Sequence, residues 1–364
     1  MPPPSTSREI VSTLEGLRAL GPQWDRLASR FSAPILSHDW FSSAAAALHS
    51  HDRLAVFVRK SGDDIVAIAP FVQRRRLGLK SLEFIGSSTL SEPSGILYDH
   101  PSHLRGILDD VSNHGLPVNI DRVNDPIIVA ELSKIAGGSV DIIRNSLATS
   151  PWIRIDGSWE AYYETITPKW RSAHRRAMKR AETTGPVSYD FISPGPSEFG
   201  ELMDRFVSVE GECWKGRLGT ALRTNDPLRT FFELYGRAAA AHGMLRFAFM
   251  RIGGTPVAAQ LAVEYARRYW LLKIGYDERF SQCSPGILLM YKTLERAFND
   301  GLEAFEFLGS NEGWIQIWSP KLHRYYARSI DSMPVRRLLA AALGLSERVN
   351  RNIRTRLART GKRS

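Results

Sequence analysis

A carboxylate that could act as a general base occurs at Glu210, at the end of a predicted amphipathic helix. Glu210 continues the apolar stripe of this helix one turn further on, so we expect its side chain on the buried face. Burial disfavours the charged form of a carboxyl group, which makes the group a better proton acceptor near neutral pH. The open alternative is an acid at a helix end that points into solvent. The apolar residues of the stripe are Phe199, Leu202, Met203, Phe206 and Val207.

Residues that follow this helix extend the candidate site. Trp214 could contact an acceptor molecule or pack against the helix. Lys215 and Lys273 could donate hydrogen bonds to an anionic substrate, although exposure to solvent is the ordinary situation of a lysine. Glu264 is a second candidate base, because it lies on the same face of a predicted strand as Gln260. A solvated charge at the end of the strand is the simpler interpretation of this acid.

The turn 281–286, Ser-Gln-Cys-Ser-Pro-Gly, is a candidate phosphate-binding site. Ser284 and Pro285 suit the N-cap and first position of a helix predicted over 285–300. A helix N-terminus presents backbone N–H groups and the positive end of the helix dipole, which favour a pyrophosphate. Gly286 would let a phosphate approach the backbone, and Gln282 adds a donor. A capped helix start without a ligand is the alternative, and no motif pairs Cys283 with a histidine.

A basic segment covers residues 169–180, after a helix-start signal at Thr167-Pro168. It contains six basic residues, Arg171 among them, and no acid. Arg171 is a candidate substrate-binding residue. A solvated helix face is the competing interpretation.

The composition is that of a folded, enzyme-sized protein whose excess positive charge is concentrated at one end. Residues 336–363 carry nine Lys/Arg against one acid, so this tail contributes +8 of the net charge of +10. Its leucines recur at near-helical spacing, and a basic amphipathic helix could contact a membrane surface, RNA or the body of the protein. The sequence shows no secretory signal, no membrane-spanning run and no metal-binding or disulfide pattern for its two cysteines. We therefore expect a cytoplasmic protein, with membrane contact at most through the tail.

The chain contains a weak internal repeat. A predicted hairpin, with strands over 54–58 and 65–71, matches a second hairpin, with strands over 245–250 and 256–263. Two helical patterns and a tryptophan precede each hairpin. Together with a turn-like cluster at Thr149-Ser150-Pro151, this order predicts an α+β protein with two domains, residues 1–150 and 151–333, followed by a tail over 334–364.

The segment 245–318 resembles the GNAT superfamily, and within it the CelD-like acetyltransferases linked to polysaccharide synthesis, which are related to the FemAB peptidoglycan transferases. The resemblance rests on G-G-T-P-V-A-A, Y-W-L-L-K-I-G-Y-D, S-P-G-I-L-L and F-E-F-L-G-S-N-E-G-W-I-Q-I-W. In the first half, I-A-P-F and L-E-F-I-G resemble the family's first half, so the resemblance covers most of residues 20–330. It implies two tandem GNAT-like domains, each a mixed, mostly antiparallel sheet flanked by helices, with no cofactor in the first.

The resemblance implies transfer of an acyl group, most simply acetyl, from acyl-CoA to an amine, with no metal. It places the acyl thioester between splayed strands at 257–264 and 269–274, with the pantetheine along the first of them and the pyrophosphate at the turn 281–286. Leu272 and Ile274 are candidate cofactor-binding residues. Glu312 matches the family's G-x-x-E position, as a third candidate base, and Trp318 its terminal tryptophan. The usual phosphate loop is reduced here to Gln282 and Gly286, and Gln316 replaces a lysine that is common in relatives.

Two other functions remain open. A FemAB-type transferase would use aminoacyl-tRNA, which the basic segment and tail favour and the lack of a coiled-coil arm disfavours. A non-catalytic binding protein could use the same duplicated scaffold, because a fold does not establish a reaction. In the first interpretation, the acceptor is a sugar or another cell-envelope precursor, free or linked to a lipid or nucleotide.

Overall fold

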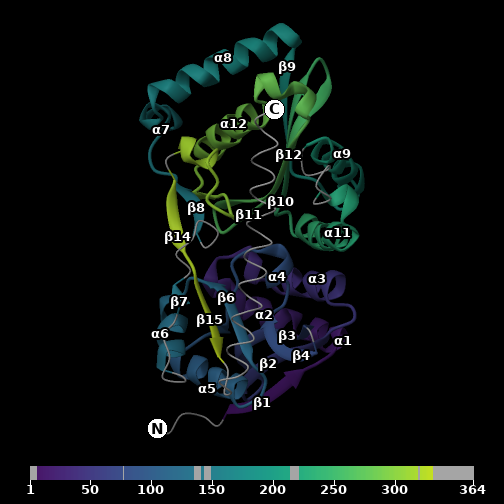
Figure 1. Ribbon diagram of the computed structural model, residues 1–364, viewed down its shortest axis with the longest axis vertical. Helices are drawn as coiled ribbons and strands as arrows, with labels where there is room; N and C mark the ends of the chain where they lie inside the picture. Colours follow the sequence, from purple (N-terminus) through teal and green to yellow (C-terminus); the bar gives the residue numbers. More distant parts are fainter. Residues whose placement is uncertain are drawn as a thin grey trace.

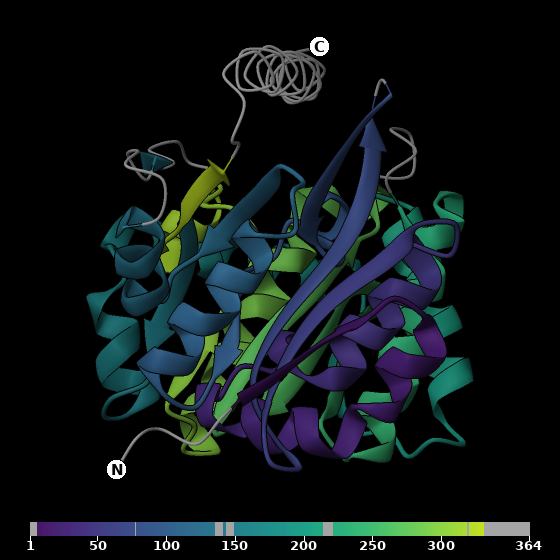
Figure 2. The ribbon, with the colours of Figure 1, turned by 90° about the horizontal axis from the view of Figure 1, so that it is seen from below.

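The computed structural model describes residues 6–76, 78–134, 141–142, 149–213, 221–318 and 320–330. It consists of two halves, each built on a mixed β-sheet with helices on both faces (Figure 1). The halves are stacked along the long axis (Figure 1), so in the view from below the first half lies in front of the second (Figure 2). Trp214, Lys215 and the tail over 334–364 lie outside the described residues.

The first sheet has the strand order β1-β2-β3-β4-β6-β15-β7, and β5 pairs with β3. Gly62, with φ of 61°, forms the turn of the predicted hairpin between β2 and β3. Helices α1 to α3 pack on one face of this sheet, and α5 and α6 pack on the other. The strands are β1 (Thr6–Val11), β2 (Arg53–Ser61), β3 (Asp64–Arg76), β4 (Leu79–Phe84), β5 (Leu97–Tyr98), β6 (Val118–Val123), β7 (Asp141–Ile142) and β15 (Tyr326–Ile330). The helices are α1 (Leu14–Ala19), α2 (Gly21–Ala28), α3 (His38–Leu48), α4 (Ser87–Leu90), α5 (Pro101–Ser112) and α6 (Pro126–Lys134).

The second sheet has the strand order β9-β10-β11-β12-β13-β8-β14. Gly253 and Gly254, both with positive φ, close the second predicted hairpin. Helices α9 and α11 pack on the face that looks toward the first half, and α7, α8 and α12 pack on the other. The strands are β8 (Thr149–Arg154), β9 (Val187–Ile192), β10 (Leu245–Ile252), β11 (Thr255–Tyr265), β12 (Arg268–Tyr276), β13 (Ala304–Glu306) and β14 (Lys321–Arg324). The helices are α7 (Trp159–Thr165), α8 (Pro168–Thr184), α9 (Phe199–Gly211), α11 (Asp226–Ala241) and α12 (Pro285–Asn299).

The two sheets repeat one pattern, which confirms the predicted fold class of two tandem GNAT-like units. In each sheet four antiparallel strands are followed by a parallel neighbour, β6 beside β4 and β13 beside β12. A helix connects the parallel pair in each half, α5 in the first and α12 in the second. The helix predicted over 285–300 is therefore confirmed.

The last described strand does not follow the predicted domain boundary. Tyr326–Ile330, which the boundary at residue 333 assigns to the second domain, pairs with β6 and β7 of the first sheet. Strand β8, at the predicted boundary near residue 150, belongs to the second sheet. The chain thus crosses between the halves twice, once before β8 and once before β15. Strand β8 pairs antiparallel with β13 of the second sheet, and β15 pairs antiparallel with β6 of the first sheet.

Equivalent helices of the two halves form the contact between them. Trp40 of α3 lies edge-on against Phe231 and Tyr235 of α11, with ring centroids 4.9 and 5.0 Å apart. These side chains belong to one apolar cluster that continues from the first sheet to the second. The halves therefore share a buried core, and the geometry between them is fixed by packing. Among the described residues, no helix is long and apolar enough to cross a membrane.

Candidate functional site at the junction of the two halves

Strands β12 and β13 diverge in the middle of the second sheet. They are paired only from Arg268 with Ala304 to Trp270 with Glu306, whereas β12 continues to Tyr276. By contrast, β11 and β12 stay paired along their whole length, from Ala258 with Tyr276 to Tyr265 with Arg268. The expectation that these two strands splay apart is therefore wrong, because a continuous antiparallel ladder joins them. The opening lies on the other side of β12.

The turn before α12 lies beyond the divergent part of β12. Ser284 is at the N-cap position with a left-handed φ of 49°, but its side chain does not cap the helix. The side chain of Gln282 is exposed, and its carbonyl accepts a hydrogen bond of 2.6 Å from Arg180 Nε of α8. A Cβ added at Gly286 would lie 3.5 Å from Tyr276, an ordinary contact. An exposed turn, Ser281-Gln282, thus leads into a helix start that stands next to a basic helix, and a helix N-terminus favours the binding of a phosphate.

Two residues assigned from the sequence to ligand binding lie elsewhere. The thiol of Cys283 is buried in an apolar cluster with Val257 and Leu288, so it cannot face a ligand at the turn. Arg171 pairs with Glu164 near the start of α8, at the end of the molecule away from the first half (Figure 1).

Glu210 lies on the buried face of α9, as predicted, with its side chain fully buried. Its Oε2 accepts a hydrogen bond of 2.8 Å from the backbone N–H of Leu222, and its Oε1 is 3.9 Å from Lys273 Nζ. A Cβ at Gly275 would lie 2.5 Å from the Cα of Glu210, so only glycine permits this close packing of α9 on β12. Glu210 therefore lies against the part of β12 that is no longer paired with β13.

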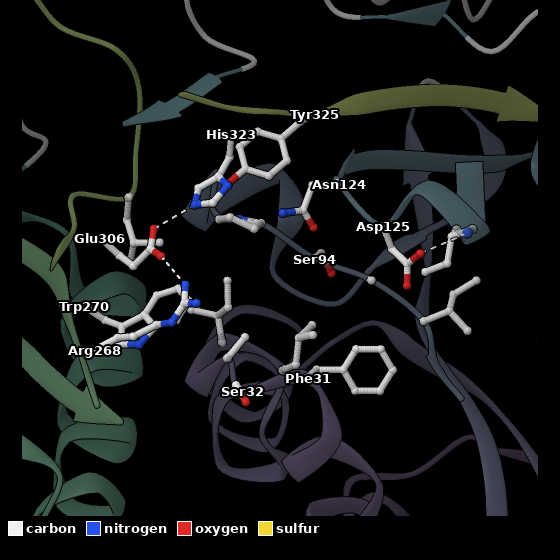
Figure 3. Close-up of a pocket in the computed structure, with 18 residues that line it drawn as sticks. Phe31, Ser32, Ser94, Asn124, Asp125, Arg268, Trp270, Glu306, His323 and Tyr325 are labelled. Atoms are coloured by element: carbon white, nitrogen blue, oxygen red, sulfur yellow. Dashed lines mark hydrogen bonds and ion pairs between the residues drawn. The ribbon is translucent and has the colours of Figure 1, made fainter. Parts of the chain in front are cut away.

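A cavity of about 200 Å³ lies between the halves, where β12 and β13 begin to diverge (Figure 3). Trp270, Glu306 and Leu308 come from the second sheet and the loop after it, and Ser94 and Asn124 come from loops of the first half. The cavity thus requires both halves. Its other lining residues are Phe31, Ser32, Ala33, Ile35, Leu36, Pro93, Gly95, Ile96, Asp125, Ile128, Arg268, His323 and Tyr325.

A buried acid, a histidine and an arginine form one wall of this cavity. Glu306 is 1% exposed and accepts hydrogen bonds from Arg268 Nη1 at 2.8 Å and from His323 Nε2 at 3.0 Å. The ring of His323 stacks on Trp152, with centroids 5.1 Å apart. Arg268 of β12, Glu306 of β13 and His323 of β14 therefore form one ion-pair cluster, at the point where β12 and β13 begin to diverge (Figure 3).

A second polar contact joins the halves beside the cavity. Glu92 Oε2 accepts a hydrogen bond of 3.0 Å from the backbone N–H of Gly309, whose carbonyl accepts one of 2.8 Å from Arg122. Burial raises the pKa of Glu92 to about 7, although the charges of Arg122 and Lys273 lower it.

Left-handed backbone conformations gather around the same junction. Ser32 and Leu308 line the cavity, and Ser91 and Arg122 adjoin it, with φ between 49° and 57°. Residues other than glycine adopt this conformation at a cost of about 1–3 kcal/mol, and such residues concentrate at functional sites. The junction is therefore a better candidate site than the outer surfaces.

The raised pKa of Glu92 predicts a pH-dependent stability. The folded protein holds this proton up to about pH 7, whereas the unfolded chain releases it near the ordinary value of 4.5. The unfolded state thus binds fewer protons between these values, so the contribution of Glu92 to stability falls as the pH rises through this window. Glutamine mimics the protonated acid. We expect the melting temperature of Glu92→Gln, relative to the wild type, to be higher at pH 8 than at pH 4.5; a constant difference would contradict this.

The remaining predicted residues do not reach the junction cavity with their side chains. Glu264 pairs with Arg246 at 3.1 Å on the α12 face of the sheet. Glu312 is exposed and accepts a hydrogen bond from Trp314. Trp318 is fully buried in the core against α12. Leu272 is buried in the core shared by the halves, and Ile274 lies on the α12 face.

The cluster of Arg268, Glu306 and His323 was not predicted from the sequence. One signal was present, since Glu306 stands between Phe305 and Phe307 in an apolar strand, where an acid needs a buried partner. No local pattern marks His323 or Ser94, because their positions depend on pairings between distant segments.

The comparisons with known proteins agree with this architecture. Residues 168–315 match the family described as acetyltransferase (GNAT) domain. No curated protein matches the sequence significantly. Among solved structures, similar folds include the C-terminal domain of a lysylphosphatidylglycerol synthetase from Agrobacterium fabrum, described there as putative (12% identity, TM-score 0.57, 92% of this chain and 96% of that one). FemX is similar at 12% identity and TM-score 0.57, over 91% of this chain and 99% of that one.

The divergent parallel strands, the helix start beyond them and the matching segment together define the class of protein. The matching segment, residues 168–315 of the second half, is a GNAT acetyltransferase domain, and this match supports an N-acyltransferase. The fold of both halves together is that of FemX.

Proposed function

We propose that the protein transfers an acyl group, most simply acetyl, from acyl-CoA to an amine of a sugar or another cell-envelope precursor. The observation that carries the proposal is the divergence of β12 and β13. This divergence lies between the start of α12, on one side of the second sheet, and the cavity between the halves, on the other side of that sheet. A thioester could thus enter from the α12 side and meet an acceptor at the junction.

In this proposal the donor lies along β12, and the base, Glu210 of α9, packs against the same part of this strand. The pyrophosphate binds at the start of α12, and the thioester lies along 271–276, where backbone N–H groups can polarise its carbonyl. Glu210 takes a proton from the amine, whose nitrogen attacks the carbonyl carbon. The C–S bond then breaks and the CoA thiolate leaves. Lys273, which is 3.9 Å from Glu210, balances the charge of the carboxylate.

A second candidate function is transfer from aminoacyl-tRNA. Two observations favour it: the full-length similarity in fold to FemX, and the basic helix α8 beside the donor turn. A thermal-shift comparison decides between the donors, because a ligand that binds the folded state raises the melting temperature. Acetyl-CoA and longer acyl-CoAs should raise it, and uncharged and aminoacylated tRNA should not. The reverse result would favour the second function.

A substitution at the donor turn tests the position of the donor. Gly286 is the second residue of α12, and a Cβ there meets no close contact, so Gly286→Leu should fold. The side chain would occupy the approach to the helix start, and we expect acetyl-CoA affinity to fall by about tenfold or more, which is ~1.4 kcal/mol. The matched control is Gly200→Leu, at the second position of α9, where a Cβ has open space. Equal affinities in calorimetric titrations of both variants would exclude this donor site.

A further inference from the structure

We propose that the cavity between the halves binds an uncharged sugar ring. If the function proposed above is correct, this ring belongs to the acceptor and lies next to its amine. The charges of the cavity wall, an unpaired hydroxyl group in that wall and the size of the cavity point to such a ligand.

The charged residues of the cavity wall are already compensated by the protein. Glu306 is bound by Arg268 and His323. Asp125 accepts three hydrogen bonds, one from Tyr98 at 2.8 Å and two from backbone N–H groups at the start of α6. A phosphate or carboxylate in the cavity would compete with these pairs, and a buried charge without its own partner is costly. The wall therefore favours an uncharged ligand.

The cavity nevertheless offers a polar group that needs a partner. Ser94 is 9% exposed, lines the cavity, and its Oγ has no hydrogen-bond partner among the described residues. A buried hydroxyl without a partner costs about 1–3 kcal/mol, which a ligand hydroxyl would recover. Asn124 lies beside it on the same side of the cavity and adds an amide (Figure 3). These groups suit a ligand that both donates and accepts hydrogen bonds.

Most of the remaining lining is apolar, and the volume is small. Trp270 lies opposite Ser94, and Ile35, Leu36 and Leu308 complete an apolar wall. A volume of about 200 Å³ is below the range of drug-sized pockets, ~300–1,000 Å³, so it suits one ring with its substituents. A sugar ring combines apolar C–H faces with a rim of hydroxyl groups. The C–H faces match the apolar side of the cavity around Trp270, and the hydroxyl groups match the polar side around Ser94 and Asn124.

Titration calorimetry of the full-length protein with methyl N-acetyl-β-glucosaminide, without any CoA compound, tests the inference. We expect binding in the range of about 1 mM, and much weaker binding of glucuronate, which has the same ring and a negative charge. Ser94→Ala should weaken binding of the neutral sugar by about threefold to tenfold. The control is Ser112→Ala, which removes another buried hydroxyl without a partner among the described residues, away from the cavity.

Equal or tighter binding of glucuronate would overturn the proposal. So would the absence of binding of the neutral sugar, or the same affinity in Ser94→Ala and Ser112→Ala. The measurement is independent of the donor. Failure of acetyl-CoA to bind would contradict the proposed function and leave the sugar site intact, whereas loss of the sugar site would leave the donor assignment intact.

Discussion

Replacing Glu210 with glutamine is expected to lower turnover by about 10²–10⁴-fold, the usual effect of losing one proton-transfer group. Glutamine keeps the shape of the side chain, and its amide oxygen can still accept the hydrogen bond from Leu222. The fold and the affinity for acyl-CoA should therefore be unchanged. Steady-state rates measure the turnover, and calorimetric titration with acetyl-CoA measures the affinity.

Glu264→Gln is the matched control for this variant. Glu264 is also an acid of the second sheet, but it pairs with Arg246 on the face away from the junction. Its replacement should leave turnover near that of the wild type. A Glu210→Gln enzyme with near-normal turnover would exclude Glu210 as the base.

The second large effect is expected at the contact between the halves. Trp40 is 3% exposed and packs against two aromatic rings of α11. Removing a buried aromatic side chain costs about 3–5 kcal/mol, so Trp40→Ala should markedly lower the free energy of unfolding in urea. Since this core joins the halves, the variant should also separate their unfolding transitions.

Trp170→Ala is the comparison for this prediction. Trp170 lies on α8 and is 38% exposed, whereas Trp40 is 3% exposed, so the loss of Trp170 removes less buried surface. We expect a clearly smaller decrease in the free energy of unfolding for Trp170→Ala than for Trp40→Ala. If both variants were destabilised to the same degree, the α3–α11 contact would not hold the halves together.

Local sequence patterns predicted the elements that depend on neighbouring residues. Glycines with positive φ mark both hairpin turns, and the Ser-Pro-Gly start and Gly301, with φ of 66°, bound α12. The apolar stripe that ends at Glu210 predicted its burial, because helical spacing alone decides which face a residue occupies.

The arrangement of the junction could not be predicted in this way. The return of β15 to the first sheet and the end of β13 pairing at Glu306 depend on contacts between segments far apart in the chain. Cys283 and Trp318 stand next to residues of the predicted site, yet their side chains turn into the cores on the α12 side. Proximity in the sequence does not decide on which side of a turn or sheet a side chain lies.

Hydrogen–deuterium exchange with and without acetyl-CoA tests the central claim most directly, because it locates the donor without knowledge of the acceptor. We predict slower exchange of backbone amides at 281–288 and at 271–276, the start of α12 and the divergent part of β12. The equivalent start of α5, residues 99–104, should be unchanged. No protection at saturating acetyl-CoA, or protection at 99–104 in place of the second half, would contradict the account.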